Sequence, residues 1–195
     1  MMVEAIEQRI KSALDKFPPV RQSFVFLLNH LNGQKEIVAA EIGVYQGLNA
    51  VSMMGNCSRL KLYCIDGYER ISIETGGAMI SERDKQAIRD CSVSLLNPFK
   101  DRVIRIFQQS EVCYKDFPDE YFDYVYIDGE HLYDYVKRDI ELWYPKVKKG
   151  GMLAGHDFEM KEVMHAVAEF RDINNMKHFA FSTGGGESDW WFIKQ

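Results

Sequence analysis

The amino-acid sequence predicts an α/β fold, in which a mostly parallel β-sheet is covered by helices on both faces. Two observations support this prediction. Short apolar runs alternate with stretches whose apolar residues recur every three or four positions, as strands alternate with amphipathic helices. The last two apolar runs, 177–181 and 190–193, have only a short loop between them, so they should pair as antiparallel strands. The expected sheet is therefore parallel except at its C-terminal end.

The composition is that of one globular domain. The chain has 195 residues, of which 46% are hydrophobic, and this is enough for a substantial core. The formal net charge of −5 argues against a nucleic-acid partner, because phosphate binding requires a basic surface. The N-terminus carries charges throughout, and no apolar run approaches the ~20 residues of a membrane span. We therefore expect a cytoplasmic protein without membrane contact. The four cysteines form no CxxC pair and should be buried and reduced, with two disulfides as the alternative.

Two amphipathic helices are expected ahead of the first strand. One covers residues 3–16, and the other covers residues 20–31 after a break at two prolines. They form an N-terminal helical extension, residues 1–33, to a catalytic core of residues 37–195 within a single domain. We expect the extension to cover the sheet; a dimer surface or a lid over the ligand are the alternatives.

The first strand, 37–43, runs into a loop that has two glycines four residues apart. Gly43 and Gly47 allow a tight turn and a close approach of the backbone to a ligand. The helix expected from Leu48 begins directly behind them, and the free N–H groups at its N-terminus suit a carboxylate or a phosphate. A plain strand-to-helix loop would show the same pattern, so this loop alone does not establish a binding site.

An acidic residue follows the second expected strand, 60–65. Asp66 lies about twenty residues beyond the glycine loop, which is the place of a carboxylate that accepts the hydroxyls of a ribose. A turn-capping Asp is the alternative, and the preceding glycine loop favours the nucleoside interpretation. The following segment, 68–80, lacks a helical or strand period and contains a Gly-Gly pair, so we expect a mobile lid there.

The middle of the chain predicts one more helix and one more strand before the final unit. The helix is expected at 82–96 and the strand at 103–107. The strand leads into Gln109 and Ser110, which could form hydrogen bonds with the edge of a heterocycle. Polar residues at strand ends are common, so this signal is weak.

Residues 122–157 predict a strand, a crossover helix and a second strand, which is the parallel βαβ unit. The first strand ends at Asp128, and His131 follows in the turn; the second ends at His156 and Asp157. Because parallel strands end at the same edge of a sheet, where ligands bind in open α/β folds, these four side chains should lie together. The Lys-Lys-Gly-Gly run between the helix and the second strand is expected to be a solvated turn.

From residue 37 to about residue 193 the chain resembles the class I S-adenosylmethionine-dependent methyltransferases. The stretch EIGVYQG, 41–47, resembles their first motif. Four features resemble the group typified by macrolide-sugar O-methyltransferases. They are the IDG-x-H turn at 127–131, the helix with Asp139 and Trp143, the Gly-Gly pair and the final His-Asp. The resemblance implies a Rossmann-like fold with a seven-stranded sheet whose C-terminal strand is reversed, and S-adenosylmethionine as the cofactor.

The resemblance also implies a set of cofactor-binding residues. Glu41 would help to hold the methionine end, and Asp66 would hold the ribose. Family members commonly carry a glycine-acid-serine run where this chain has Gln108, Gln109 and Ser110, so the chain departs from the pattern near the adenine. The complete expected set is Glu41, Gly43, Tyr45, Gln46, Gly47, Asp66, Gln109, Ser110 and Asp128.

Methyl transfer to a hydroxyl requires removal of the proton of the acceptor. His131 is the candidate general base, or a further metal ligand, and Asp128 is the second catalytic candidate. Asp128, His156 and Asp157 resemble the place at which catechol-type O-methyltransferases bind magnesium. Because magnesium prefers oxygen ligands, manganese or another divalent cation is an equal candidate for a site that contains a histidine. In the alternative interpretation, the two aspartates cap helices and His131 is an exposed turn residue.

The sequence therefore predicts a methyltransferase that acts on an oxygen of a small polar molecule. It leaves open whether a metal assists the reaction, what the acceptor is and whether the protein forms a homodimer. A nicotinamide-dependent Rossmann oxidoreductase is one alternative, although Gly43 and Gly47 do not supply its G-x-G-x-x-G pattern. A non-catalytic module that binds adenosylmethionine is the other.

Overall fold

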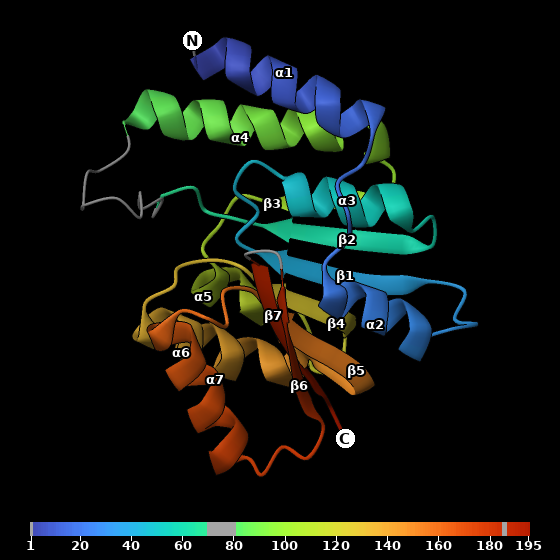
Figure 1. Ribbon diagram of the computed structural model, residues 1–195, viewed down its shortest axis with the longest axis vertical. Coiled ribbons are helices and arrows are strands. Elements are labelled where there is room, and N and C mark those ends of the chain that lie inside the picture. Colours follow the sequence, from blue (N-terminus) through green and yellow to red (C-terminus); the bar gives the residue numbers. More distant parts are fainter. Residues whose placement is uncertain (1, 70–80, 185–186) are drawn as a thin grey trace.

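A computed structural model describes residues 2–69, 81–184 and 187–195 of the chain, which form one sheet with helices on both faces (Figure 1). The strands are β1 Ile37–Ile42, β2 Leu60–Ile65, β3 Val103–Ile106, β4 Phe122–Ile127, β5 Val147–Gly155, β6 Phe179–Gly184 and β7 Glu187–Ile193. The α-helices are α1 Met2–Asp15, α2 Gln22–His30, α3 Leu48–Asn56, α4 Glu82–Leu96, α5 Ser110–Cys113, α6 Tyr133–Trp143 and α7 Lys161–Ile173. Short 3₁₀ turns cover Asn97–Phe99, Tyr114–Asp116 and Tyr144–Lys146.

The strand order in the sheet is β3-β2-β1-β4-β5-β7-β6. The strands from β3 to β5 pair in parallel, whereas β7 is antiparallel to both of its neighbours, β5 and β6. The expected mostly parallel sheet with a reversed C-terminal strand is therefore confirmed. The connections after β1 and β4 run to opposite sides, toward β2 and β5, so the strand order reverses between β1 and β4. Open α/β sheets bind their ligands at this point, outside the carboxyl ends of the strands.

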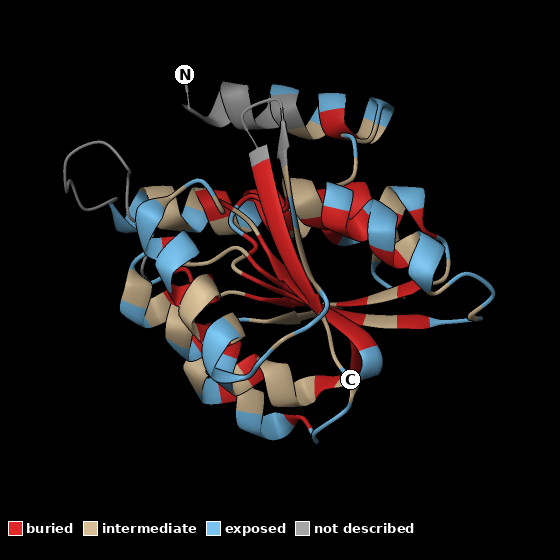
Figure 2. Ribbon diagram, turned by 60° about the horizontal axis from the view of Figure 1, so that its bottom comes forward, coloured by how far each residue is buried: buried red, intermediate tan, exposed pale blue. Residues whose placement is uncertain are grey.

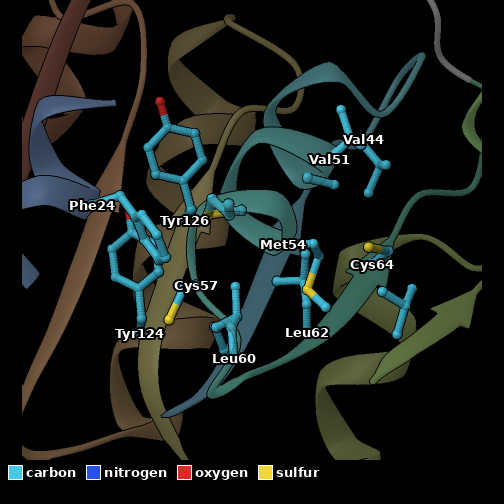
Figure 3. Close-up of a cluster of buried hydrophobic side chains, with 14 of the residues drawn as sticks. Phe24, Val44, Val51, Met54, Cys57, Leu60, Leu62, Cys64, Tyr124 and Tyr126 are labelled. Atoms are coloured by element: carbon cyan, nitrogen blue, oxygen red, sulfur yellow. The ribbon is translucent and has the colours of Figure 1, made fainter. Parts of the chain in front are cut away.

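The core consists of two apolar layers, one on each face of the sheet, and the strands between them are buried (Figure 2). Strand β4 contributes to both layers, because successive side chains of a strand point to opposite faces. Tyr124 and Tyr126 pack with α2 and α3 in one layer, as Figure 3 shows for the neighbourhood of Phe24 and Met54. Val125 and its β4 neighbours pack with α6 and α7 in the other layer. Burial on both faces explains why the sequence of β4 is a continuous apolar and aromatic run.

The N-terminal helices pack against the rest of the domain on one face. Helix α1 contacts α3 and α4, and α2 contacts β5, β6 and β7. A buried carboxylate fixes α2: the backbone N–H and the hydroxyl of Ser23 donate to Asp189 Oδ2 at 2.9 and 2.7 Å. The hydroxyl of Tyr126 donates to the other oxygen, Oδ1, at 2.9 Å. The start of α2 is therefore tied to β7 and, through Tyr126, to β4.

The structure corrects two expectations about the C-terminal strands. The run 148–151, expected to be a solvated turn, lies inside β5 as a bulge, where the pairing with β4 shifts register. Lys194, directly after β7, stabilises this bulge. The N–H of Gly150 donates to the Lys194 carbonyl at 2.7 Å, and the N–H of Lys194 donates to the Gly151 carbonyl at 2.9 Å. The loop expected at 182–188 is mostly strand, since β6 and β7 extend into it.

Three remaining expectations concern the cysteines, membrane-spanning helices and the lid. Cys57, Cys64, Cys91 and Cys113 are buried and form no disulfide, as expected. Within the described residues, no helix combines the length and the apolar character that a membrane crossing requires. Most of the expected lid, residues 70–80, falls outside the described residues.

Candidate active site

The loop after β1 lies against the turn after β4. Gly43 has a φ of +83°, and its N–H donates to the Ile65 carbonyl at 2.9 Å. A Cβ atom at this position would lie 2.2 Å from the carbonyl oxygen of Asp128, so only glycine fits here. Gly47 also has a positive φ, +84°, and is the residue from which α3 begins. The two glycines therefore bring the N-terminus of α3 next to the end of β4.

Asp66 holds this loop in place. Its Oδ2 accepts hydrogen bonds from the backbone N–H groups of Val44 and Tyr45 at 2.9 and 2.8 Å, and its Oδ1 accepts one from Tyr68 at 2.7 Å. Burial raises the pKa of the Asp66 carboxyl, and these three hydrogen bonds oppose that effect. Because a carboxylate offers about four acceptor positions, capacity for a ligand hydroxyl remains. The residue expected to hold a ribose thus also shapes the glycine loop.

Glu41, at the end of β1, is a buried acid with an unsatisfied oxygen. The side chain is only 1% exposed, and Asn49 donates a hydrogen bond to its Oε1 at 2.8 Å. Among the described residues, nothing within hydrogen-bonding distance satisfies the buried Oε2. Burial raises the pKa of Glu41 to about 8, against the Asn49 hydrogen bond. A buried polar atom without a partner is costly, so Oε2 marks a place where a ligand donor would be stabilised.

The other expected cofactor residues lie around this loop. Tyr45 is 47% exposed and has a φ of +49°, whereas Gln46 is buried. Gln109 lies against Gly67, next to Asp66, because a Cβ atom at Gly67 would be 2.5 Å from the Gln109 amide nitrogen. These residues therefore surround the carboxyl ends of β1 and β2.

Ser110 lies close in sequence to these residues but is turned toward α6. It is buried, and its hydroxyl donates a hydrogen bond to the carboxylate of Asp139. This bond links the short helix α5 to α6. The hydroxyl expected to contact the cofactor is thus engaged within the protein.

The four polar residues of the βαβ unit lie together at the edge, as expected. His131 Nε2 lies 2.9 Å from Asp157 Oδ2, and His156 Nδ1 lies 3.0 Å from Asp157 Oδ1. His156 Nδ1 is also 3.7 Å from Asp128 Oδ1. Asp157 therefore uses its two carboxylate oxygens for the two different histidines. We refer to Asp128, His131, His156 and Asp157 as the edge cluster.

Asp157 has a strained backbone that its neighbour helps to hold in place. Its φ is +56°, a left-handed conformation that a non-glycine residue rarely adopts. The preceding residue, His156, donates its backbone N–H to the Ile127 carbonyl at 3.1 Å. Its backbone carbonyl accepts a hydrogen bond from the Trp190 indole at 3.2 Å. Backbone strain of this kind persists only where the surroundings enforce it, and it is found most often at functional sites.

The charges in the edge cluster shift the pKa values of its members. Burial raises the pKa of Asp128 to about 6, against the charge of His156. Burial also raises the pKa of Asp157, but hydrogen bonds from His131 and His156 outweigh it and hold that pKa well below its usual range. Burial lowers the pKa of His156, and the hydrogen bond to Asp157 and the charge of Asp128 more than compensate, so the net change is upward. Asp157 is therefore ionised at neutral pH.

The described residues contain one set of three donors that could hold a metal ion, and it differs from the expected metal ligands by one residue. One donor atom each from Asp128, His131 and Asp157 lie within 4.8 Å of one another. The expected set contained His156 in place of His131. His156 instead turns its Nε2 toward Arg21, whose Nη1 lies 2.8 Å away. Arg21 is the site residue that the sequence did not reveal, because it belongs to the N-terminal extension and carries no motif.

Comparison with known proteins gives one family. A family model described as "Methyltransferase domain" matches residues 40–158, which is more than half of the chain. The protein y4gI of Sinorhizobium fredii is 33% identical over 79 residues. That alignment covers 38% of this chain and 9% of y4gI, so the chain spans a small part of the curated relative that it matches.

Solved structures share the fold at low sequence identity. An O-methyltransferase from Bacillus cereus in complex with SAH is 14% identical, with a TM-score of 0.63, and the match covers 98% of this chain and 90% of the other. The O-methyltransferase NovP is 18% identical, with a TM-score of 0.60 and coverage of 100% and 80%. An rRNA methylase from Streptococcus thermophilus is 16% identical, with a TM-score of 0.63 and coverage of 91% and 96%.

Proposed function

The chain belongs to the family described as Methyltransferase domain, and on this premise we propose that it transfers the methyl group of S-adenosylmethionine to an oxygen of a small polar acceptor. One observation carries the proposal. The unsatisfied acid Glu41 lies near the end of β1, and the edge cluster follows the neighbouring strands β4 and β5, next to the point where the strand order reverses. A site for a cationic cofactor and a site for proton removal are therefore side by side.

The residues around β1 and β2 fit this cofactor. An ammonium group from its methionine end would satisfy the buried Oε2 of Glu41. Asp66 has acceptor capacity left for a ribose hydroxyl, and Gln109 lies next to it, where it can meet the edge of an adenine. When bound, S-adenosylmethionine supplies an electrophilic methyl group. The protein contributes the orientation of the acceptor and the removal of its proton.

His131 is the proposed general base. Asp157 accepts a hydrogen bond from His131 Nε2 at 2.9 Å, which fixes the imidazole and stabilises its protonated form. The side chain of His131 is 32% exposed, so an acceptor can approach it, while that of Asp157 is 12% exposed. Asp128 is largely buried beside them and adds negative charge that favours protonation of the base.

The same cluster can hold a divalent cation. Asp128, His131 and Asp157 offer two carboxylates and one imidazole, a donor set suited to manganese and, less well, to magnesium. A bound cation would supply Lewis acidity that lowers the pKa of an acceptor hydroxyl. If His131 ligated the cation through Nε2, that atom could not also donate to Asp157. Metal ligation and base orientation are thus alternative uses of this atom, and a chelator separates them.

The two competing functions have less support. A nicotinamide-dependent oxidoreductase would require a different glycine pattern in the loop that Gly43 begins. A module that only binds the cofactor would have no use for the strained Asp157 or for its contact with His131. Four further parts of the proposal derive from the sequence alone. They are the acceptor class, a cytoplasmic location, the absence of a nucleic-acid partner and a homodimer.

The experiment uses the purified protein with methyl-labelled S-adenosylmethionine and a panel of sugars, phenols and other small hydroxyl compounds. We expect a labelled ether product and S-adenosylhomocysteine. His131→Ala should lower the rate of product formation by about 10²- to 10⁴-fold, whereas His178→Ala, which removes an exposed histidine, should leave it unchanged. Cofactor binding without transfer to any acceptor would favour the binding module. Absence of cofactor binding would refute the proposed function.

A further inference from the structure

Arg21 brings the N-terminal extension into contact with the edge cluster. The residue immediately precedes α2 and has an extended backbone, with φ −60° and ψ 151°. Its guanidinium Nη1 lies 2.8 Å from Nε2 of His156, although the two residues are 135 positions apart in sequence. A residue outside the strand ends of the core is therefore part of the candidate active site.

This contact is supported by buried hydrogen bonds. Ser23, two residues after Arg21, donates its N–H and its hydroxyl to Asp189 of β7. Asp189 is only 3% exposed, and its second oxygen accepts from Tyr126, which lies two residues before Asp128 on β4. The start of α2 is thus fixed relative to β7 and to β4, the strand that leads into Asp128 and His131. Arg21 reaches His156 from an anchored position.

The chemistry of the contact determines which ring nitrogen of His156 carries a proton. A guanidinium has five N–H donors and no acceptor, so Nε2 of His156 must accept with its lone pair. A neutral imidazole has one N–H, which is then on Nδ1. Nδ1 lies 3.0 Å from Asp157 Oδ1 and donates to it. The opposite ring orientation would turn carbon atoms toward both partners and lose both hydrogen bonds.

We propose that Arg21 is a positioning residue that fixes His156 as a hydrogen-bond donor to Asp157 and thereby prevents His156 from acting as a metal ligand. Both ring nitrogens are engaged, one as acceptor from Arg21 and the other as donor to Asp157. Asp157 Oδ1 is in turn committed to His156, so Oδ2 is presented to His131. Partners of this kind orient the residues that touch metal or substrate.

The inference deepens the proposed function, and its structural part stands on its own. If the protein transfers no methyl group, the tautomer of His156 can still be measured. If the tautomer is different, the methyltransferase proposal keeps its support from Glu41, Asp66 and the His131–Asp157 contact. The two can therefore fail separately.

The primary test is ¹⁵N NMR of the histidine side chains in the protein without cofactor or metal, at about pH 9, where imidazoles are neutral. The ring signals of His156 are assigned by comparison with His156→Gln. We expect the pattern of an Nδ1–H tautomer in the wild type. An Nε2–H pattern would overturn the proposal without any need for an arginine variant.

The second test is Arg21→Met, with Arg171→Met as the matched control. Arg171 pairs with its neighbour Asp172 on α7 and has no part in the site. We expect Arg21→Met to shift His156 away from the pure Nδ1–H tautomer and Arg171→Met to leave it unchanged. An unchanged tautomer in Arg21→Met would show that Asp157 alone sets it and would overturn the role of Arg21.

Kinetics and metal binding complete the test. Loss of a residue that orients a ligand or base typically costs on the order of 10- to 100-fold in activity, so kcat should fall by this factor in Arg21→Met while the affinity for S-adenosylhomocysteine persists. Arg21→Lys, which keeps a donor, should restore most of the rate. For Mn²⁺ binding to the protein, His156→Gln should retain the ion and His131→Gln should weaken it. Loss of Mn²⁺ in His156→Gln with retention in His131→Gln would contradict the proposal.

Discussion

The imidazole of His131 and the carboxylate of Asp157 lie 2.9 Å apart, although they follow two different strands, β4 and β5. They meet because these strands are parallel neighbours that end at the same edge of the sheet. The contact joins a partly exposed imidazole to a carboxylate whose pKa is held well below its usual range, so the carboxylate is charged at neutral pH. The proposed roles of His131 as the base and of Asp157 as the group that orients it rest on this contact.

Substitutions of these two residues should reduce the rate to different extents. Removal of a general base costs typically 10²- to 10⁴-fold, so we expect a loss of this size in kcat for His131→Ala. Asp157→Asn keeps the shape but loses the charge, and should cost on the order of 10- to 100-fold. Steady-state kinetics, with calorimetry of S-adenosylhomocysteine binding as the control for folding, measures both. Full activity in Asp157→Asn would contradict the orienting role.

Metal removal should separate the two uses of the edge cluster. If Asp128, His131 and Asp157 hold a divalent cation during catalysis, transfer should stop in EDTA and return with manganese or magnesium. Cofactor binding should survive, because Glu41, on β1, and Asp66, directly after β2, are not among these three donors. If EDTA leaves turnover unchanged, the metal proposal is wrong and the His131–Asp157 pair acts alone.

The buried acid Glu41 should make the protein without cofactor less stable at alkaline pH. Its folded-state pKa, about 8, lies above its ordinary value of 4.5. The stability that Glu41 contributes is therefore fully present below pH 4.5 and is lost as the pH rises through 8. Each unit of pKa corresponds to about 1.4 kcal/mol, so the loss amounts to a few kcal/mol. Urea unfolding at several pH values should show this loss in the wild type and not in Glu41→Gln.

The control for this prediction is Glu162→Gln, which changes an exposed acid on α7. It should follow the wild-type pH profile. Identical profiles for the wild type and Glu41→Gln would mean that Glu41 does not titrate in the expected range.

Cofactor binding should release a proton from Glu41. An ammonium group next to the carboxyl favours its charged form and lowers its pKa. Near pH 7, binding of S-adenosylhomocysteine to the wild type should therefore release protons, which calorimetry in two buffers of different ionisation enthalpy detects. Glu41→Gln should show no such release. Equal proton release in both proteins would show that the proton comes from a group other than Glu41.

Alanine at Gly43 should be much more damaging than alanine at Gly33. Both glycines have positive φ, +83° and +92°, so each substitution carries the left-handed cost of about 1–2 kcal/mol. At Gly33 the added methyl meets open space, whereas at Gly43 it lies 2.2 Å from the Asp128 carbonyl oxygen. Thermal unfolding should show a larger loss for Gly43→Ala, which should also lose cofactor affinity. Equal losses in the two variants would show that the contact with β4 is unimportant.

Much of the fold follows from local sequence pattern. The bounds of α4 and β2 coincide with the apolar periods that predicted them, because no other signal competes in those segments. The edge cluster was also predictable, since a right-handed βαβ unit brings both strand ends to one edge. The bulge at 148–151 was not, because a Lys-Lys-Gly-Gly run suits a turn equally well and the bulge is held by hydrogen bonds with Lys194, far away in the sequence.

The contacts between distant segments could not be predicted. Nothing in the sequence near Arg21 indicates that it meets His156, since that contact depends on how α2 packs on β7. The bonds from Asp66 to the glycine loop depend on backbone conformations that the residue types permit but do not enforce.

The central claim is that the ends of β1 and β2 bind S-adenosylmethionine, and calorimetric titration with S-adenosylhomocysteine tests it most directly. We predict one binding site per chain in the wild type, no heat with NADH, and a loss of about 1–3 kcal/mol in binding free energy for Asp66→Ala, the scale of hydrogen bonds to a charged group. Binding of NADH, or S-adenosylhomocysteine affinity that is unchanged in Asp66→Ala, would contradict the account.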